Sequence, residues 1–444
     1  MTETMQQFTG DLDTDSQPPL AIPFAHFVLG VAILLIGGAI AGLGSFVPGI
    51  DPAGAGPLHL LLAGWIGLTI MGAMTQFVPV WSGTSLYSRR LSVASLWLVT
   101  LGVAGLVAGF LFEYTWLLIG ASVLLIGFWT FAYNIVRTLP PVRTFDITET
   151  HFAFALASLL VATVLGWVLA TDIAFRVLGG LIAPSRIVLS HLTLTVFGFV
   201  LATIVGALYQ LAPMFTQAET TAVDAHLAHV EMVALPGGIA LLATGRLLGS
   251  TRVGTFGGVV FLTGALAFSG FLARQLWRAR VEVGPLLRRY GLVVASLVGW
   301  IALTVPYWLV NPVSVFTRFG GPMGTHLLFV GVFTLTIVGT FYHVVPFIVW
   351  YHRYSDRLGY ESVPMVDDLY DDRIATVEFW LLAVGLAGLW IGDVLATTRV
   401  IAVGGNLLGA GILLFGANMA GVVWRHRPET VREVLATLAG QSTA

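Results

Sequence analysis

The sequence predicts an all-α membrane protein, a polytopic helical bundle of 12 transmembrane helices in three pseudo-symmetric four-helix repeats. Hydrophobic residues make up 57% of the 444 residues and charged residues only 10%. Apolar runs of about 20 residues, the length that crosses a bilayer as a helix, recur along the whole chain. A segment of similar sequence also occurs three times at nearly equal spacing. These observations exclude an aqueous globular fold.

The repeated segment is the evidence for internal symmetry. Its copies begin at Leu58, Leu192 and Thr325, which lie 134 and 133 residues apart. Aligned without gaps, His59, Thr193 and His326 take the same place. Self-similarity at a fixed period indicates one structural unit used several times. A unit of this length contains about four membrane helices, so the period divides the chain into thirds.

Each apolar run is expected to be a helix, because the bilayer core offers no partner for unpaired backbone groups. The predicted spans are 22–45, 58–81, 92–112, 115–137, 151–171, 187–212, 228–248, 254–277, 290–310, 322–350, 375–396 and 400–424. They form one membrane domain, 22–424, with repeats at approximately 22–137, 151–277 and 290–424. Residues 1–21 and 425–444 are the predicted N-terminal and C-terminal tails.

The distribution of positive charge predicts the orientation of the chain. Lysine is absent, so all 21 positively charged residues are arginine. Most of them fall in loops or tails on one side: Arg89, Arg90, Arg137, Arg143, Arg274, Arg278, Arg280, Arg288, Arg289, Arg353, Arg357, Arg373, Arg425, Arg427 and Arg432. The positive-inside rule then places both termini in the cytoplasm, and we expect a multi-pass protein of a prokaryotic plasma membrane. The acidic N-terminal segment lacks the basic region of a cleaved signal peptide, so the first span is expected to stay in the mature protein.

Composition also limits the chemistry and the partners. The chain has no cysteine, which excludes disulfides, thiolate-held iron–sulfur clusters, thiolate-bound copper and haem attached through Cys-x-x-Cys-His. Any metal must be held by His, Met, Tyr or carboxylate groups. A formal net charge of -2 and the lack of a dense basic cluster predict no nucleic-acid partner. Membrane lipid is the expected surrounding.

His59 and His326 are the candidate metal ligands. Each begins a central helix of its repeat near the predicted outer surface. Ligands at matched depth on helices related by pseudo-symmetry can face each other across a slot, and imidazole is the usual axial ligand of haem iron in helical bundles. The alternative is a pair of interfacial histidines in contact with lipid headgroups. Their matched position in two repeats favours ligation.

The chain resembles the heme–copper oxidase superfamily, specifically its twelve-helix catalytic subunit I, which includes oxygen reductases and nitric oxide reductases. The segments PLHLLLAGWIGLTIMGAM and GTHLLFVGVFTLTIVGTFYHVVP look like the family's second and tenth helices. Those helices carry the two histidines that hold a low-spin haem, and His59 and His326 stand at those places. The resemblance therefore implies a low-spin, bis-histidine haem b.

The sequence departs from the family at the catalytic centre. The family's tenth helix has His-x-His, whose first histidine holds a high-spin haem, whereas this chain has Gly324 there. His191 is similar to the family's first copper ligand, but the adjacent histidine pair expected in the seventh span is absent. Residues 234–245 read ALPGGIALLATG instead. The resemblance thus implies a degenerate binuclear site, and copper is not expected.

Other polar residues are secondary candidates. Arg399 lies in the outer turn where the family places arginines that pair with haem propionates, and Asp393 is expected to orient it. An idle, solvated arginine is the alternative. His226, His229 and His343 lie near the predicted inner ends of their spans and form a candidate inner polar site for a quinone head or a second haem. Ordinary interfacial hydrogen bonding is the alternative for them.

Three classes of function remain open at this point. The leading expectation is an integral membrane b-type haem protein, similar to heme–copper oxidase subunit I, in membrane electron transfer or respiratory O2 or NO chemistry. Its donor would be a quinol or a small redox protein, with an additional subunit as a further partner. A non-catalytic oxidase-like subunit is the second class. A twelve-helix secondary transporter is the third, although carrier repeats commonly come as halves rather than thirds.

Overall fold

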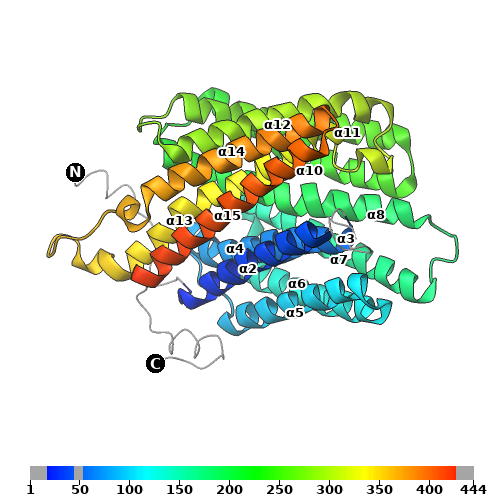
Figure 1. The fold of residues 1–444 in the computed structure, drawn as a ribbon, viewed down its shortest axis with the longest axis horizontal. Coiled ribbons are helices and arrows are strands. Elements are labelled where there is room, and N and C mark those ends of the chain that lie inside the picture. The colour runs from blue at the N-terminus through cyan, green and yellow to red at the C-terminus, as the bar shows by residue number, and fades with distance from the viewer. Residues whose placement is uncertain (1–17, 45–53, 427–444) are drawn as a thin grey trace. The chain divides into compact units, whose positions relative to one another are not determined.

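The computed structural model describes residues 18–44 and 54–426. These fall into two compact units, one ending at Gly179 and the other beginning at Gly180, so the boundary lies within the second predicted repeat. Figure 1 shows the helices of both units. Of the predicted tails, the structure describes only residues 18–21, 425 and 426. Both termini lie outside the described residues, so their predicted orientation stays a prediction from the sequence.

The predicted fold class is confirmed. Twelve helices among the described residues are long and apolar enough to cross a membrane. Regular structure within these residues is otherwise limited to short helical turns and one isolated bridge between Leu358 and Glu361. The chain is therefore an all-α, multi-pass membrane protein. The three-repeat plan remains a prediction from the sequence.

The first unit contains five of the membrane-spanning segments. Its elements are α2 (Ala21–Gly44), α3 (Ala55–His59), the π-helix η2 (Leu60–Gly67), α4 (Leu68–Ser82), α5 (Arg89–Leu111), α6 (Tyr114–Thr138), the 3-10 turn η3 (Val142–Thr144) and α7 (Ile147–Phe175). α3, η2 and α4 run on as one segment, Ala55–Ser82. α2 packs along η2 and α4, and α5 packs along α6.

The second unit contains the remaining seven segments. Its longer elements are α8 (Pro184–Thr193), the π-helix η4 (Leu194–Leu201), α9 (Ala202–Thr216), α10 (Ala222–Leu248), α11 (Thr251–Trp277), α12 (Pro285–Val310), the π-helix η7 (Leu327–Thr334), α13 (Leu335–Tyr354), α14 (Asp372–Val394) and α15 (Thr398–His426). Its 3-10 turns are η5 (Val315–Thr317), η6 (Pro322–Gly324), η8 (Ser355–Arg357) and η9 (Val366–Leu369). α10 and α11 lie side by side, as do α14 and α15 (Figure 1).

Glycines set the close packing of these helix pairs. A Cβ atom built on Gly120 of α6 would lie 2.1 Å from the backbone N of Leu106 on α5. One built on Gly238 of α10 would lie 2.1 Å from the backbone N of Phe261 on α11. One built on Gly404 of α15 would lie 2.7 Å from the backbone N of Leu389 on α14. Small residues let membrane helices approach until their backbones touch, and each of these hairpins uses that device.

Local capping explains why several helices begin earlier than the hydropathy pattern predicts. α7 starts at Ile147 rather than 151, because Asp146 and Glu149 form a reciprocal capping box. α10 starts at Ala222 rather than 228, because Thr221 and Asp224 do the same. Residues 222–227, which include the polar Asp224 and His226, therefore belong to the helix, although they lie outside its predicted apolar run.

Candidate functional site

His326 lies where the chain enters the membrane segment of η7 and α13. It is the N-cap residue of the π-helix η7, and its Nδ1 donates a hydrogen bond to Oδ2 of Asp393 on α14 at 2.6 Å. Both side chains are partly exposed, at 30% and 25%. In the neutral ring, donation from Nδ1 leaves the lone pair on Nε2. A carboxylate that holds the Nδ1 proton is the usual outer partner of a metal-ligating histidine.

The loop before His326 is held by buried side chains of unit 2. Arg246 of α10 is fully buried, and it donates hydrogen bonds to the carbonyls of Pro312, Thr317 and Arg318 at 2.9 to 3.0 Å. On α12, Trp300 donates through Nε1 to the carbonyl of Phe319 at 2.7 Å. These bonds satisfy loop carbonyls that would otherwise be buried without partners. The loop is thereby fixed as an ordered entry to η7.

Gly324 ends the last turn before His326. It is buried, and a Cβ atom at this position would lie 3.0 Å from Cδ1 of Trp300. The backbone is packed against the indole ring, so the chain at residue 324 has no room for a metal-binding side chain without a shift of Trp300. This packing agrees with the absence of a second histidine at that place in the sequence.

His59 occupies the corresponding position in the first unit. It is the N-cap residue of the π-helix η2, and its Nδ1 donates to the carbonyl of Ala55 at 2.7 Å. Its ring lies 5.5 Å, centroid to centroid, from that of Phe110 in the last turn of α5. The Nδ1 hydrogen bond again assigns the lone pair of a neutral ring to Nε2.

Thr193 completes the set of aligned residues. It is the N-cap residue of the π-helix η4, and its hydroxyl accepts a hydrogen bond from Arg246 at 2.7 Å. His59, Thr193 and His326 thus each precede an eight-residue π-helix, and each is contacted from the end of a following long helix. π-helical segments are rare and occur often at functional sites. Their presence immediately after both candidate ligands marks these two positions.

The hydrogen bond from Nδ1 to a backbone carbonyl does not by itself distinguish a metal-ligating histidine from other histidines. His26, His151 and His352 each make the same bond to the residue four positions earlier, at 2.7 to 3.0 Å. None of these three precedes one of the described π-helices. His59 is therefore distinguished by its place at the start of η2, and His326 by both its place and its carboxylate partner.

The predicted pairing of Asp393 with Arg399 is wrong, because the carboxylate of Asp393 bonds His326 instead. Arg399 is the second residue of α15 and is exposed. No ion pair joins it to an acidic group among the residues the structure describes. Sequence reasoning missed the role of Asp393, although an acidic residue at the end of an apolar helix was a usable indication.

The remaining candidates are dispersed over unit 2. His191 lies on α8 and is partly exposed, and His226 and His229 lie exposed on α10. His343 of α13 packs its ring edge-on against Phe215 at 4.5 Å. Within residues 18–44 and 54–426, no three His, Asp or Glu side chains stand close enough together to hold a metal ion.

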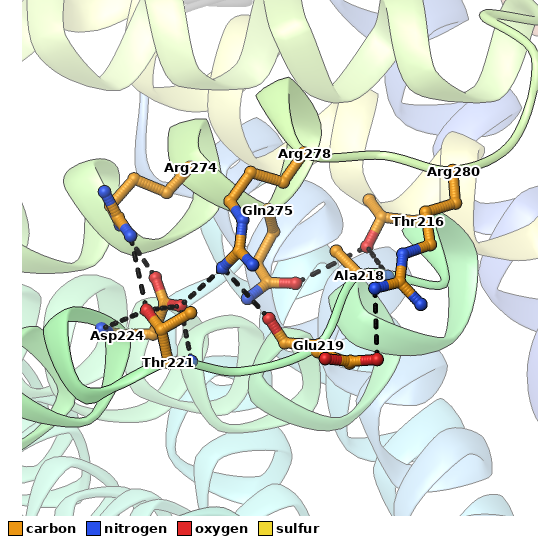
Figure 2. Close-up of polar contacts among 9 residues, drawn as sticks. All are labelled: Thr216, Ala218, Glu219, Thr221, Asp224, Arg274, Gln275, Arg278 and Arg280. Atoms are coloured by element: carbon orange, nitrogen blue, oxygen red, sulfur yellow. Dashed lines mark hydrogen bonds and ion pairs between the residues drawn. The ribbon is translucent and has the colours of Figure 1, made fainter.

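An ion-pair network fixes the start of α10, where His226 and His229 lie. Asp224, whose side chain is fully buried, accepts from Arg274 at 2.9 Å and pairs with Arg278 at 3.5 Å, and Arg280 pairs with Glu219 at 3.0 Å. Figure 2 shows these arginines, from the end of α11 and the residues after it, reaching the α9–α10 loop. The network ties this loop to the end of α11 and has a structural role.

The comparisons with known proteins assign no relationship. The sequence matches no protein-family model and no curated protein.

Proposed function

We propose that this chain is a membrane b-type haem protein of electron transfer, built on the plan of heme–copper oxidase subunit I, with His59 and His326 as axial ligands. The supporting observation is that both histidines precede a π-helix and both hold Nδ1 in a hydrogen bond, so that Nε2 carries the lone pair. Their pairing on one iron is inferred from the sequence repeat. If held by His59 and His326, haem would supply one-electron exchange.

The residues of the chain would have distinct tasks in this function. The carbonyl of Ala55 and the carboxylate of Asp393 orient the two imidazole rings and fix their tautomers. The loop held by Arg246 and Trp300 sets the position of η7. Arg399, on the same end of unit 2 as Asp393, remains the proposed partner of a haem propionate. A quinol or a small redox protein is the proposed donor.

An optical spectrum with ligand variants tests this proposal. The purified protein should show a Soret band and a low-spin alpha band, and His59→Ala or His326→Ala should each abolish the low-spin alpha band, because a low-spin iron needs both axial donors. His151→Ala is the matched control, since His151 makes the same Nδ1–carbonyl bond without preceding a π-helix. Wild-type spectra in both ligand variants would refute the assignment. A protein without any Soret band would favour a carrier instead.

A further inference from the structure

A second polar site lies inside unit 2, formed by an ion pair between Arg289 of α12 and Glu378 of α14. The two side chains are only 1% and 0% exposed. Nη2 of Arg289 also donates to the carbonyl of Ala375 at 3.2 Å. A buried ion pair is stable only when its remaining polar atoms are also hydrogen-bonded, because both charges have lost their water.

Here that requirement is not met. Within the described part of the chain, Oε1 of Glu378 and Nε of Arg289 have no hydrogen-bond partner. An unsatisfied buried carboxylate oxygen is costly in a protein interior, and more so between membrane helices. The site therefore has an open acceptor position on Oε1, next to a fixed cation.

The groups around Glu378 are suited to handling a proton. The hydroxyl of Tyr342, on α13, lies beside the carboxylate, and its ring lies 4.7 Å from the guanidinium carbon of Arg289. The Tyr342 oxygen accepts a hydrogen bond from Nδ2 of Asn418 on α15 at 3.3 Å. A hydroxyl that accepts this bond keeps its own proton as a donor, so Tyr342 can donate to the Glu378 carboxylate.

The site is close to an acidic surface loop. Glu378 follows Asp372 by six residues of α14, about 9 Å of helix. Tyr370, at the edge of this loop, packs its ring 5.1 Å from that of Tyr342. Desolvation and the neighbouring carboxylates of Asp368 and Asp372 raise the pKa of Asp367. Desolvation and repulsion among these carboxylates therefore favour proton binding at Asp367, in the loop before α14.

We propose that Glu378 is a reversible proton-binding site, supplied from the acidic loop at residues 367–372. An O–H bond forms on Oε1 when a proton enters, no other covalent bond breaks, and no electron moves. The new carboxylic acid donates to the Tyr342 oxygen or accepts from its hydroxyl. Arg289 remains a cation, so the cluster changes from neutral to a single positive charge.

The charged and titratable groups that face Glu378 are few. α12 presents Arg289, α13 presents Tyr342, and the loop before α14 presents Tyr370 with the carboxylates beyond it. The face of α15 contributes the neutral Asn418. Burial and the carboxylates of Asp367 and Asp372 raise the pKa of Tyr370 to about 12, so Tyr370 keeps its proton at neutral pH. This site does not depend on the haem proposal.

Infrared difference spectroscopy of the full chain in detergent or lipid tests the proposal. Between mildly acidic and alkaline pH, the wild-type protein should lose the carbonyl stretch of a buried carboxylic acid, and this band should shift in D2O and on 13C labelling of glutamate. Glu378→Gln should remove the band. Tyr342→Phe should keep the band but shift its frequency, since a hydrogen-bond partner has gone.

Glu231→Gln is the matched control, because Glu231 is an equally buried glutamate on another membrane helix, α10. That variant should leave the Glu378 band in place. The absence of any glutamic-acid band across the pH range would show that the Arg289–Glu378 pair is permanently ionised and purely structural. The same band, persisting in Glu378→Gln with unchanged frequency and intensity, would also overturn the proposal. If Glu378→Gln does not fold, the proposal is tested by two other observations. These are the carbonyl band of 13C-labelled glutamate in the wild-type protein and the shift of that band in Tyr342→Phe.

Discussion

At the scale of single residues, the two candidate ligands differ in the group that holds Nδ1. Ala55 offers a neutral carbonyl to His59, whereas Asp393 offers a carboxylate to His326. A carboxylate partner makes an imidazole more basic and a stronger donor to a metal. His326 is therefore expected to set the electronic character of the site more than His59 does.

Replacing Asp393 tests this difference. In an Asp393→Asn protein the His326 ring loses its anionic partner, donates less to the iron and stabilises the ferric state less. We expect the haem midpoint potential to rise by tens of millivolts, where a tenfold change in the equilibrium corresponds to about 59 mV. A redox titration followed at the alpha band measures this shift while haem content stays constant.

Two further variants separate an electronic role from a structural one. Asp393→Glu should restore most of the wild-type potential, since it returns the carboxylate. Arg399→Gln should shift the potential in the opposite direction, to a lower value, because a cation near a propionate favours reduced iron. If wild type and Asp393→Asn retain haem and have equal midpoint potentials, Asp393 has only a packing role. That result would leave the proposal of haem binding unaffected.

At the scale of elements, adjacent glycines on one helix have opposite roles. Gly238 of α10 faces α11 so closely that a Cβ atom would lie 2.1 Å from the backbone N of Phe261. Gly237, the residue before it, is exposed, and a Cβ atom there would meet nothing within 4 Å. The close approach of α11 therefore requires glycine at position 238 but not at position 237.

The Gly238→Ala and Gly237→Ala variants form a matched pair. Gly238→Ala should destabilise the protein by roughly 1–3 kcal/mol, because α10 and α11 must separate. Gly237→Ala should be neutral or stabilising by about 0.5–1 kcal/mol, because alanine has less backbone freedom than glycine in the unfolded chain and therefore loses less entropy on folding. Thermal unfolding in detergent compares them. Equal stability of the two variants would contradict the close α10–α11 packing.

At the scale of the whole molecule, metal content is the property expected to distinguish this chain from a conventional oxygen reductase. Gly324 is packed against Trp300 and provides no ligand for a catalytic iron, and His191 lies on α8 while His226 and His229 lie at the start of α10. A copper site needs several donors held at bonding distance. The known binuclear arrangement would require histidines that the chain does not have.

Metal analysis of the purified protein should therefore find haem without stoichiometric copper. Carbon monoxide should change the reduced spectrum little, because an iron with two imidazole ligands has no open position. Stoichiometric copper, together with rapid carbon monoxide binding to a high-spin haem, would show that other residues build a catalytic centre.

The sequence by itself determined the fold class and the number of spans. Hydropathy sufficed for these because a bilayer permits only helices or closed barrels, and apolar runs of helical length occur twelve times within the residues that the structure describes. The alignment of the three copies also singled out His59 and His326, which the structure places before equivalent π-helices. Helix starts were less accurate, since capping residues such as Thr221 extend a helix beyond its apolar run.

Only the tertiary structure decided which side chains meet. Asp393 bonds His326 from 67 residues away and not the nearby Arg399, and Glu378 pairs with Arg289 from 89 residues away. The π-helices were also not predicted. These features depend on the rotation and depth at which separate helices pack, which hydropathy does not specify because it averages over every face of a helix. The backbone contacts of the glycines and the buried hydrogen bonds fix that packing, and with it the partners of each polar group.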